Sequence, residues 1–238
     1  MLVICSLRRC NTADTKESCM SLLKRMMGQC KKPSGRFGRI LASGMNFGHS
    51  GLTKWGLGFI DIARDIDALD IGCGGGRTVG RLAEIATDGT VVGIDYSPDA
   101  VVVARKKNRA LINEGRVEIL QEAVSSMRFS DGAFGLITAF ESHYFWPDFR
   151  NDLKEVHRVT KQNGQLLIVG ALYKNKKYDR RNQRIVDAIV MTYLNIEELR
   201  EVLEAVGYSE FDAREEKNKG WFAVKCKKQL NQSGVGPG

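Results

Sequence analysis

The stretch that most constrains this chain is a glycine-rich run that begins with an acid, Asp70-Ile-Gly-Cys-Gly-Gly-Gly76. An apolar run leads into Asp70, and a second apolar run, Val91-Val-Gly-Ile-Asp95, ends in another acid 25 positions later. This order predicts a strand, a glycine turn, a helix and a second strand, as in parallel α/β sheets. Both acids would then stand at the carboxyl ends of parallel strands, where such sheets bind adenosine-containing cofactors.

The spacing of the glycines indicates which cofactor fits. Gly72, Gly74 and Gly76 allow positive φ and a close approach of the backbone to a ligand. In the dinucleotide fingerprint G-x-G-x-x-G the third glycine would fall at Arg77, whereas here it comes one position early. Asp70 would repel a pyrophosphate and suits a cation, such as the α-ammonium group of S-adenosylmethionine. A nicotinamide-dependent oxidoreductase is therefore a disfavoured alternative.

From about Trp55 to Lys228 the sequence resembles the class I S-adenosylmethionine-dependent methyltransferases. The resemblance implies an α/β fold: a doubly wound, Rossmann-like, mostly parallel seven-stranded sheet with an antiparallel C-terminal hairpin and an N-terminal helical lid. Several segments in the family's order carry it: the first cofactor motif Asp70–Gly76, the ribose-binding acid Asp95, the fourth strand Phe134–Phe140, the helix Leu153–Val159, and the turn Asn163-Gly164 before the fifth strand Gln165–Val169.

The resemblance implies a cofactor site at the carboxyl ends of the parallel strands. It assigns cofactor binding to Asp70, Gly72, Cys73, Gly74 and Asp95, with Asp95 accepting hydrogen bonds from the ribose hydroxyls and Tyr96 flanking the adenine. The chain departs from the family after the third strand, because Ala123 stands where an acid often holds the adenine amino group. Either Glu122 substitutes for that acid, or backbone amides around Ala123 and Val124 hold the adenine.

The loop after the fourth strand, Glu141-Ser-His-Tyr-Phe-Trp146, is the expected wall of the methyl-acceptor site. Glu141, His143 and Tyr144 are the candidate catalytic residues, Glu141 as an acid at a strand end and His143 as a general base. Packing of the core is an equal alternative for Tyr144 and Trp146. His49 is a second histidine that would close over the site, and no spacing of cysteines and histidines indicates a metal.

Periodicity predicts the elements and the divisions of the chain. We expect a basic N-terminal extension over 1–33, a helical lid over 34–64, the methyltransferase domain over 65–228 and a flexible tail over 229–238. The domain would contain strands at 67–71, 90–94, 117–120, 134–140, 165–171, 208–213 and 221–226, and helices at 77–86, 97–113, 149–160 and 195–206.

Charge and cysteine usage bear on partners and compartment. The net charge is +8, and residues 1–45 contribute most of it, with nine Lys or Arg against Asp14 and Glu17. Such an arm could contact RNA, an anionic membrane or an acidic substrate, and a solvated leader is the simplest interpretation. The six cysteines form no Cys-x-x-Cys pair, which favours free thiols in the cytoplasm, and no run is long enough to span a membrane.

These patterns together predict a methyltransferase that uses S-adenosylmethionine and acts on a small molecule. Two alternatives stay open. One is an RNA or protein methyltransferase that docks through the basic arm, and the other is a non-catalytic S-adenosylmethionine-binding protein. The sequence leaves the acceptor atom and the oligomeric state open, with a dimer among the options.

Overall fold

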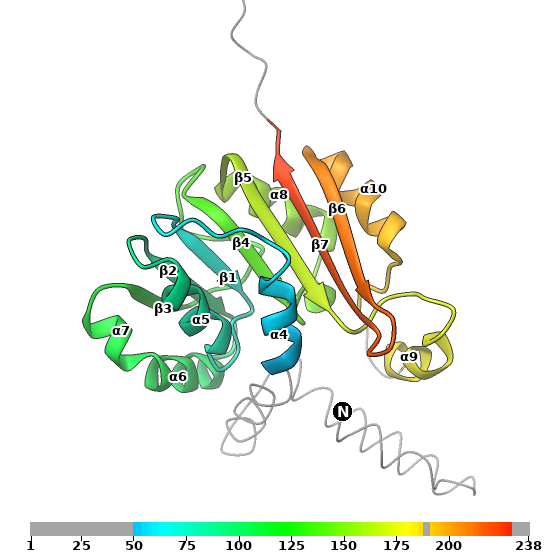
Figure 1. The fold of residues 1–238 in the computed structure, drawn as a ribbon, viewed down its shortest axis with the longest axis horizontal. Helices are drawn as coiled ribbons and strands as arrows, with labels where there is room; N and C mark the ends of the chain where they lie inside the picture. The colour runs from blue at the N-terminus through cyan, green and yellow to red at the C-terminus, as the bar shows by residue number, and fades with distance from the viewer. Residues whose placement is uncertain (1–49, 188–190, 230–238) are drawn as a thin grey trace, which may run out of the picture.

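The computed structural model describes residues 50–187 and 191–229. Their core is a seven-stranded sheet with the order β3-β2-β1-β4-β5-β7-β6 (Figure 1). The first five strands are parallel, and β7 runs antiparallel to both β5 and β6, so the predicted fold class is confirmed. The strands are β1 Ala68–Ile71, β2 Val91–Asp95, β3 Val117–Gln121, β4 Phe134–Phe140, β5 Thr160–Gly170, β6 Tyr208–Glu216 and β7 Trp221–Lys228.

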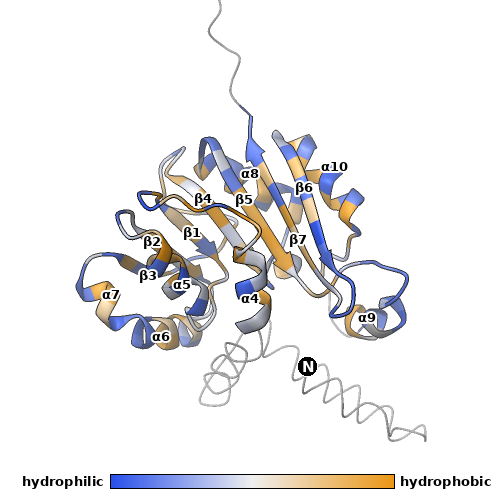
Figure 2. Cartoon of the chain, viewed as in Figure 1, coloured by the Kyte–Doolittle hydropathy of each residue, from blue (hydrophilic) through white to orange (hydrophobic). Residues whose placement is uncertain are grey.

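Helices cover both faces of this sheet (Figure 1). Side chains alternate along the central strands, so that Ala68 joins the core beneath α4, α5 and α6, while Leu69 joins the core against α8 and α10. Figure 2 shows that apolar residues concentrate along the central strands. The helices are α4 Ser50–Leu57, α5 Arg77–Ile85, α6 Pro98–Lys107, α7 Arg109–Asn113, α8 Phe149–Val159, α9 Asp179–Val186 and α10 Ile196–Val206, with the short 3-10 turn η2 at His143–Phe145.

The single helix predicted over 97–113 is wrong, because the structure has two helices that meet at Asn108. The Asn108 side chain is buried and its Nδ2 atom donates to the carbonyl oxygens of Gly76 and Ala104, both at 2.9 Å. Ser97 caps the start of α6, since its side chain accepts from the Ala100 amide.

Two further differences lie around β5. The strand begins at Thr160, five residues before the predicted start, because Thr160 pairs with Phe134 before the register shifts. Helix α9 forms in a highly charged segment for which the sequence predicted no helix. The antiparallel hairpin of β6 and β7 forms as expected.

Helix α4 lies within the predicted lid segment and packs over the carboxyl end of β5. A Cβ at Gly56 would lie 2.8 Å from the Val169 side chain and 2.9 Å from the ring of Phe140. The predicted extension over 1–33, residues 34–49 with His49, and residues 230–238 lie outside the described residues, so the proposed divisions stay predictions. No helix among residues 50–187 and 191–229 has the length and apolarity to cross a bilayer.

Candidate functional site

A cavity of about 250 Å³ opens at the carboxyl ends of β1, β2 and β4. It reaches from the glycine loop after β1 to the aromatic loop after β4, and α4 closes part of it with Leu52 and Thr53. Most of the predicted site residues line it, namely Asp70, Gly72, Cys73, Gly74, Asp95, Tyr96, Ala123, Val124 and Glu141. One continuous space therefore joins the predicted cofactor residues to the predicted acceptor loop.

The glycine loop between β1 and α5 adopts the conformation expected from its sequence. Gly72, Gly74 and Gly76 all have positive φ, at 72°, 52° and 74°. A Cβ at Gly72 would lie 2.5 Å from the Cβ of Ser142, so the chain needs glycine there for packing. A Cβ at Gly74 would meet no atom within 4 Å, which leaves this stretch of backbone open toward the cavity.

Asp95 connects the end of β2 to this loop. Its Oδ2 atom accepts from the Gly74 amide and its Oδ1 atom accepts from the Ser97 amide, both at 2.9 Å. The residue is 8% exposed, and burial raises the pKa of its carboxyl group. Each carboxylate oxygen has a second lone pair, so Asp95 can accept further hydrogen bonds from a ligand diol in the cavity.

Asp70 lies at the floor of the cavity and is 1% exposed. Its Oδ1 atom accepts from the hydroxyl of Thr138 on β4 at 2.7 Å. Burial raises the pKa of Asp70 to about 7, and the negative charge of Asp95 acts in the same direction. A cation placed beside this carboxylate would favour its ionised form, because opposite charges stabilise each other most where water is excluded.

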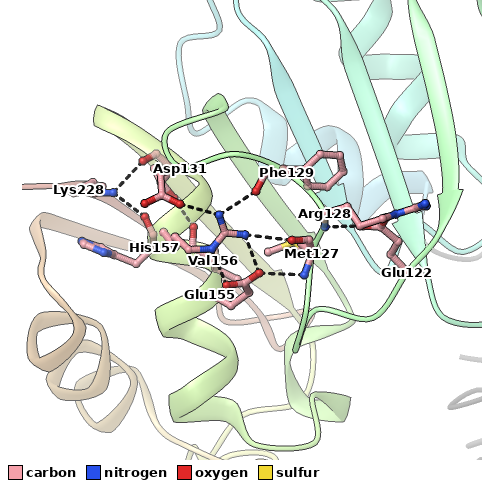
Figure 3. A network of polar contacts seen from close by, with 11 residues as sticks. Glu122, Met127, Arg128, Phe129, Asp131, Glu155, Val156, His157 and Lys228 are labelled. Atoms are coloured by element: carbon pink, nitrogen blue, oxygen red, sulfur yellow. Dashed lines mark hydrogen bonds and ion pairs between the residues drawn. The ribbon is translucent and has the colours of Figure 1, made fainter.

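Glu122, Ala123 and Val124 also line the cavity, as does the exposed residue Tyr96. The Glu122 carboxylate is engaged with Arg128, since one oxygen pairs with the guanidinium group and the other accepts from the Arg128 amide at 3.4 Å (Figure 3). Arg128 itself is mostly solvent-exposed. Glu122 thus lines the cavity, and its negative charge is paired with the positive charge of Arg128.

The loop that follows Glu122 is held in place by α8. Arg158 donates to the carbonyl oxygens of Met127 and Phe129, at 3.0 and 2.7 Å, and pairs with Glu155 and Asp131 (Figure 3). Because a guanidinium group presents five donors, one side chain can hold several turns of this loop together. The network positions the wall without reaching into the cavity.

The loop after β4 brings Glu141, Phe145, Trp146 and Pro147 to the cavity. Glu141 has a φ of 55°, an uncommon conformation for a residue other than glycine. Its Oε2 atom accepts from the hydroxyl of the buried Tyr144 at 2.7 Å. Tyr144 does not itself line the cavity among the described residues, so it reaches the site only through Glu141.

His143 points away from the cavity, which the sequence did not predict. The η2 turn directs it into the core, where its ring lies 4.6 Å from Tyr144 and 5.7 Å from Phe222, between ring centres. Burial lowers its pKa to about 3, so the ring stays neutral at ordinary pH. Within residues 50–187 and 191–229 its Nδ1 atom has no hydrogen-bond partner. This position does not suit a general base for a ligand in the cavity.

Sequence reasoning missed two positioning residues. Thr138 is a polar residue within the apolar run of β4, and that interruption was the available signal for its contact with Asp70. Asn108 is a buried polar residue between α6 and α7, and its contact with Gly76 joins the end of α6 to the glycine loop. Leu52 and Thr53 line the cavity, whereas the sequence predicted only that some residues of the segment 34–64 would cover it.

Comparison with known proteins agrees with this geometry. Residues 69–168 match the family model described as a methyltransferase domain. Demethylmenaquinone methyltransferase of Bacillus cereus is 31% identical over 120 residues, which are 50% of this chain and 50% of that protein. Sterol 4-C-methyltransferase of Caenorhabditis elegans is 27% identical over 125 residues, which are 52% of this chain and 36% of that protein. The chain matches half or less of the length of these two relatives.

Solved structures share the fold. The putative methyltransferase of Haloferax volcanii, in complex with the Trm112 activator, superposes with a TM-score of 0.70 at 19% identity, covering 79% of this chain and 94% of that one. Human N-acetylserotonin methyltransferase, in complex with S-adenosylmethionine, gives a TM-score of 0.67 at 13% identity, covering 81% and 56%. Residues 69–168 are thus similar to a methyltransferase domain, and the likeness to these solved structures shows a shared fold.

Proposed function

We propose that the chain transfers a methyl group from S-adenosylmethionine to an apolar small-molecule acceptor. The observation that supports this most is the continuity of the cavity from Asp70 and Asp95 to the loop at Glu141. One end has the groups that suit an ammonium and a ribose, and the other end has an aromatic wall with one carboxylate.

The described residues fit the cofactor. Asp70 would hold the α-ammonium group, Asp95 the ribose hydroxyls, and the bare backbone at Gly74 would let the ligand lie close to the loop. Tyr96 would flank the adenine. Backbone groups around Ala123 and Val124 would hold its edge, because the Glu122 carboxylate is engaged with Arg128. When bound, S-adenosylmethionine supplies an electrophilic methyl group on a positively charged sulfur.

The protein's contribution to the reaction is mainly alignment in a dry pocket. Phe145, Trp146 and Pro147 would orient the acceptor, and such positioning contributes about 7–11 kcal/mol in favourable cases. Where the acceptor atom bears a proton, Glu141 would take it, with the Tyr144 hydroxyl holding the carboxylate in place. We assign His143 to the packing beneath this loop and not to proton transfer.

The names of the two curated relatives support an apolar acceptor, since one acts on a sterol and the other on demethylmenaquinone. The aromatic lining of the cavity near Glu141 points the same way. An RNA or protein acceptor, and a non-catalytic binding role, are the alternatives.

Methyl-labelled S-adenosylmethionine separates these alternatives. The full chain is incubated with apolar phenols and quinols, with RNA, and with a protein mixture, and the label is followed into each fraction. We expect the label in the organic phase. Label in RNA or protein instead would favour docking through the basic arm, and cofactor binding without transfer to any acceptor would favour a binding protein.

A further inference from the structure

Exposed cations gather on three segments that are far apart in the sequence, one of which, α4, also lines the cavity. Lys54 belongs to α4, Lys176 and Arg180 to the α9 segment, and Lys217 and Lys219 to the turn between β6 and β7. All five are solvent-exposed. We call these residues, together with Lys177, the basic rim. Figure 2 shows that the β6–β7 turn is hydrophilic and that α9 carries both hydrophilic and apolar residues.

Direct contacts join the three segments. The Lys177 ammonium group donates to the carbonyl oxygen of Lys217 at 3.1 Å. The Lys219 ammonium group lies 4.5 Å from the centre of the Trp221 ring, and that ring lies 5.9 Å from the ring of Trp55 on α4. The basic rim is therefore one continuous surface with two tryptophans at its centre.

This surface adjoins the cavity. Residues Leu52 and Thr53 of α4 line the cavity, and Lys54 and Trp55 follow directly on the same helix. Phe222 of β7 pairs with Gly170 at the carboxyl end of β5, so the β6–β7 turn lies at the same edge of the sheet as the cavity (Figure 1).

The carboxylates within the rim have neighbours of their own. Asp179 accepts from the Asn175 amide and the Tyr193 hydroxyl. Glu215 accepts from the Tyr173 hydroxyl, and Glu216 from the Asn218 amide. The six cations of the basic rim outnumber these three carboxylates, so the rim carries a net positive charge.

We propose that the basic rim docks the protein onto an anionic lipid bilayer, with the cavity facing the lipid. This rests on the proposed function, because an apolar acceptor partitions into the bilayer and must be drawn from it. Lysines near an anionic leaflet are attracted to it. Single-stranded RNA would need exposed aromatic faces for stacking, whereas Trp55 and Trp221 pack against each other and Lys219 covers Trp221.

The experiment is co-sedimentation of the full chain with vesicles of phosphatidylcholine, alone or mixed with phosphatidylserine, at low and at high salt. We expect binding to the mixed vesicles only, and weaker binding as salt increases. Each lysine near such a surface is worth about 1 kcal/mol, or about fivefold in affinity. The double variant Lys217→Glu/Lys219→Glu should therefore lose at least about twentyfold.

The matched control is Arg109→Glu/Lys154→Glu, on α7 and α8, which changes the net charge equally outside the rim. Retained binding by this control, with loss in the rim variant, supports the proposal. Equal loss in both variants, absence of vesicle binding by the wild type, or tighter binding to an RNA oligonucleotide at the same salt would overturn it. A melting curve of each variant shows that it is folded, and Lys217→Gln/Lys219→Gln offers a milder substitution.

Calorimetry with S-adenosylhomocysteine on the same samples distinguishes the two proposals. A chain that binds S-adenosylhomocysteine and ignores vesicles refutes the docking surface and leaves the proposed function standing. A chain that does not bind S-adenosylhomocysteine refutes the proposed function whatever the vesicles show.

Discussion

The carboxylate of Asp95 accepts a hydrogen bond from the amide of Gly74 at 2.9 Å, which ties the end of β2 to the loop after β1. Its other oxygen accepts from the Ser97 amide at the start of α6. One side chain thus positions the bare backbone of the glycine loop and also faces the cavity where a ribose would lie. Binding and positioning should therefore fail together when this carboxylate is altered.

The substitution Asp95→Asn tests this double role. Both carboxylate oxygens accept from backbone amides, so the Nδ2 atom of asparagine would face an amide donor. We expect a stability loss of about 1–3 kcal/mol and a loss of at least about tenfold in S-adenosylhomocysteine affinity. Thermal melts and calorimetry measure the two effects. As a control, Asp88→Asn at an exposed acid before β2 should change neither the stability nor the affinity. An unchanged affinity in Asp95→Asn would refute the proposal that Asp95 binds the ribose.

Gly74→Ala and Gly115→Ala form a matched pair. Both glycines have positive φ, at 52° and 72°, and a Cβ at either would meet no atom within 4 Å. Each substitution should cost about 1 kcal/mol of stability through backbone strain. Only Gly74 lines the cavity, so only Gly74→Ala should weaken S-adenosylhomocysteine binding, by at least about tenfold. Equal affinities in the two variants would mean that the ligand does not approach this loop.

Asp70 should make the ligand-free protein less stable as pH rises. Its pKa is about 7 when folded against 3.8 in the unfolded chain, so the folded state binds more protons between these values. The stability from the protonated form is complete below about pH 4 and declines as pH rises through about 7, by at most about 4 kcal/mol. Melts of Asp70→Asn should match the wild type in acid and exceed it above pH 7.

The same carboxylate gives the opposite trend in binding. Its ionised form attracts an ammonium group, so the wild-type affinity for S-adenosylhomocysteine should increase as pH rises through about 7. Calorimetry of Asp70→Asn over the same range should show weaker binding without this increase. An identical pH profile in the variant would exclude Asp70 as the partner of the ammonium group.

Glu122→Gln addresses how the adenine is held. Because both Glu122 oxygens contact Arg128, we expect the backbone around Ala123 and Val124 to hold the adenine instead. Calorimetry should then show less than about a threefold loss of affinity. The stability loss should stay below about 1 kcal/mol, because the Arg128 partner is exposed. A tenfold loss of affinity would show that the Glu122 carboxylate contacts the adenine itself.

The strands of the sheet could be predicted from the sequence because the residues that mark each strand end lie next to it in the chain. The glycine run needs positive φ at Gly72 and Gly74, and an acid that follows an apolar run, as at Asp70 and Asp95, marks a strand end. Helix α9 escaped prediction because its segment is highly charged and lacks a long apolar stripe. The break at Asn108 depends on a contact with Gly76, 32 positions away, which no local pattern reveals.

The acceptor loop shows the same limit. Its composition indicated a wall of aromatic and titratable residues, and Glu141, Phe145 and Trp146 do line the cavity. Which of them face inward depends on the η2 turn and on packing against Phe149 and Phe222. These contacts bury His143 although it lies only two residues from Glu141.

Isothermal calorimetry of the full wild-type chain with S-adenosylhomocysteine, and separately with NADH, tests the central claim most directly. The two acids flanking a bare glycine loop predict saturable binding of S-adenosylhomocysteine and none of NADH, with the affinity reduced in Asp95→Asn. Absence of S-adenosylhomocysteine binding by the folded chain, or preference for NADH, would contradict it.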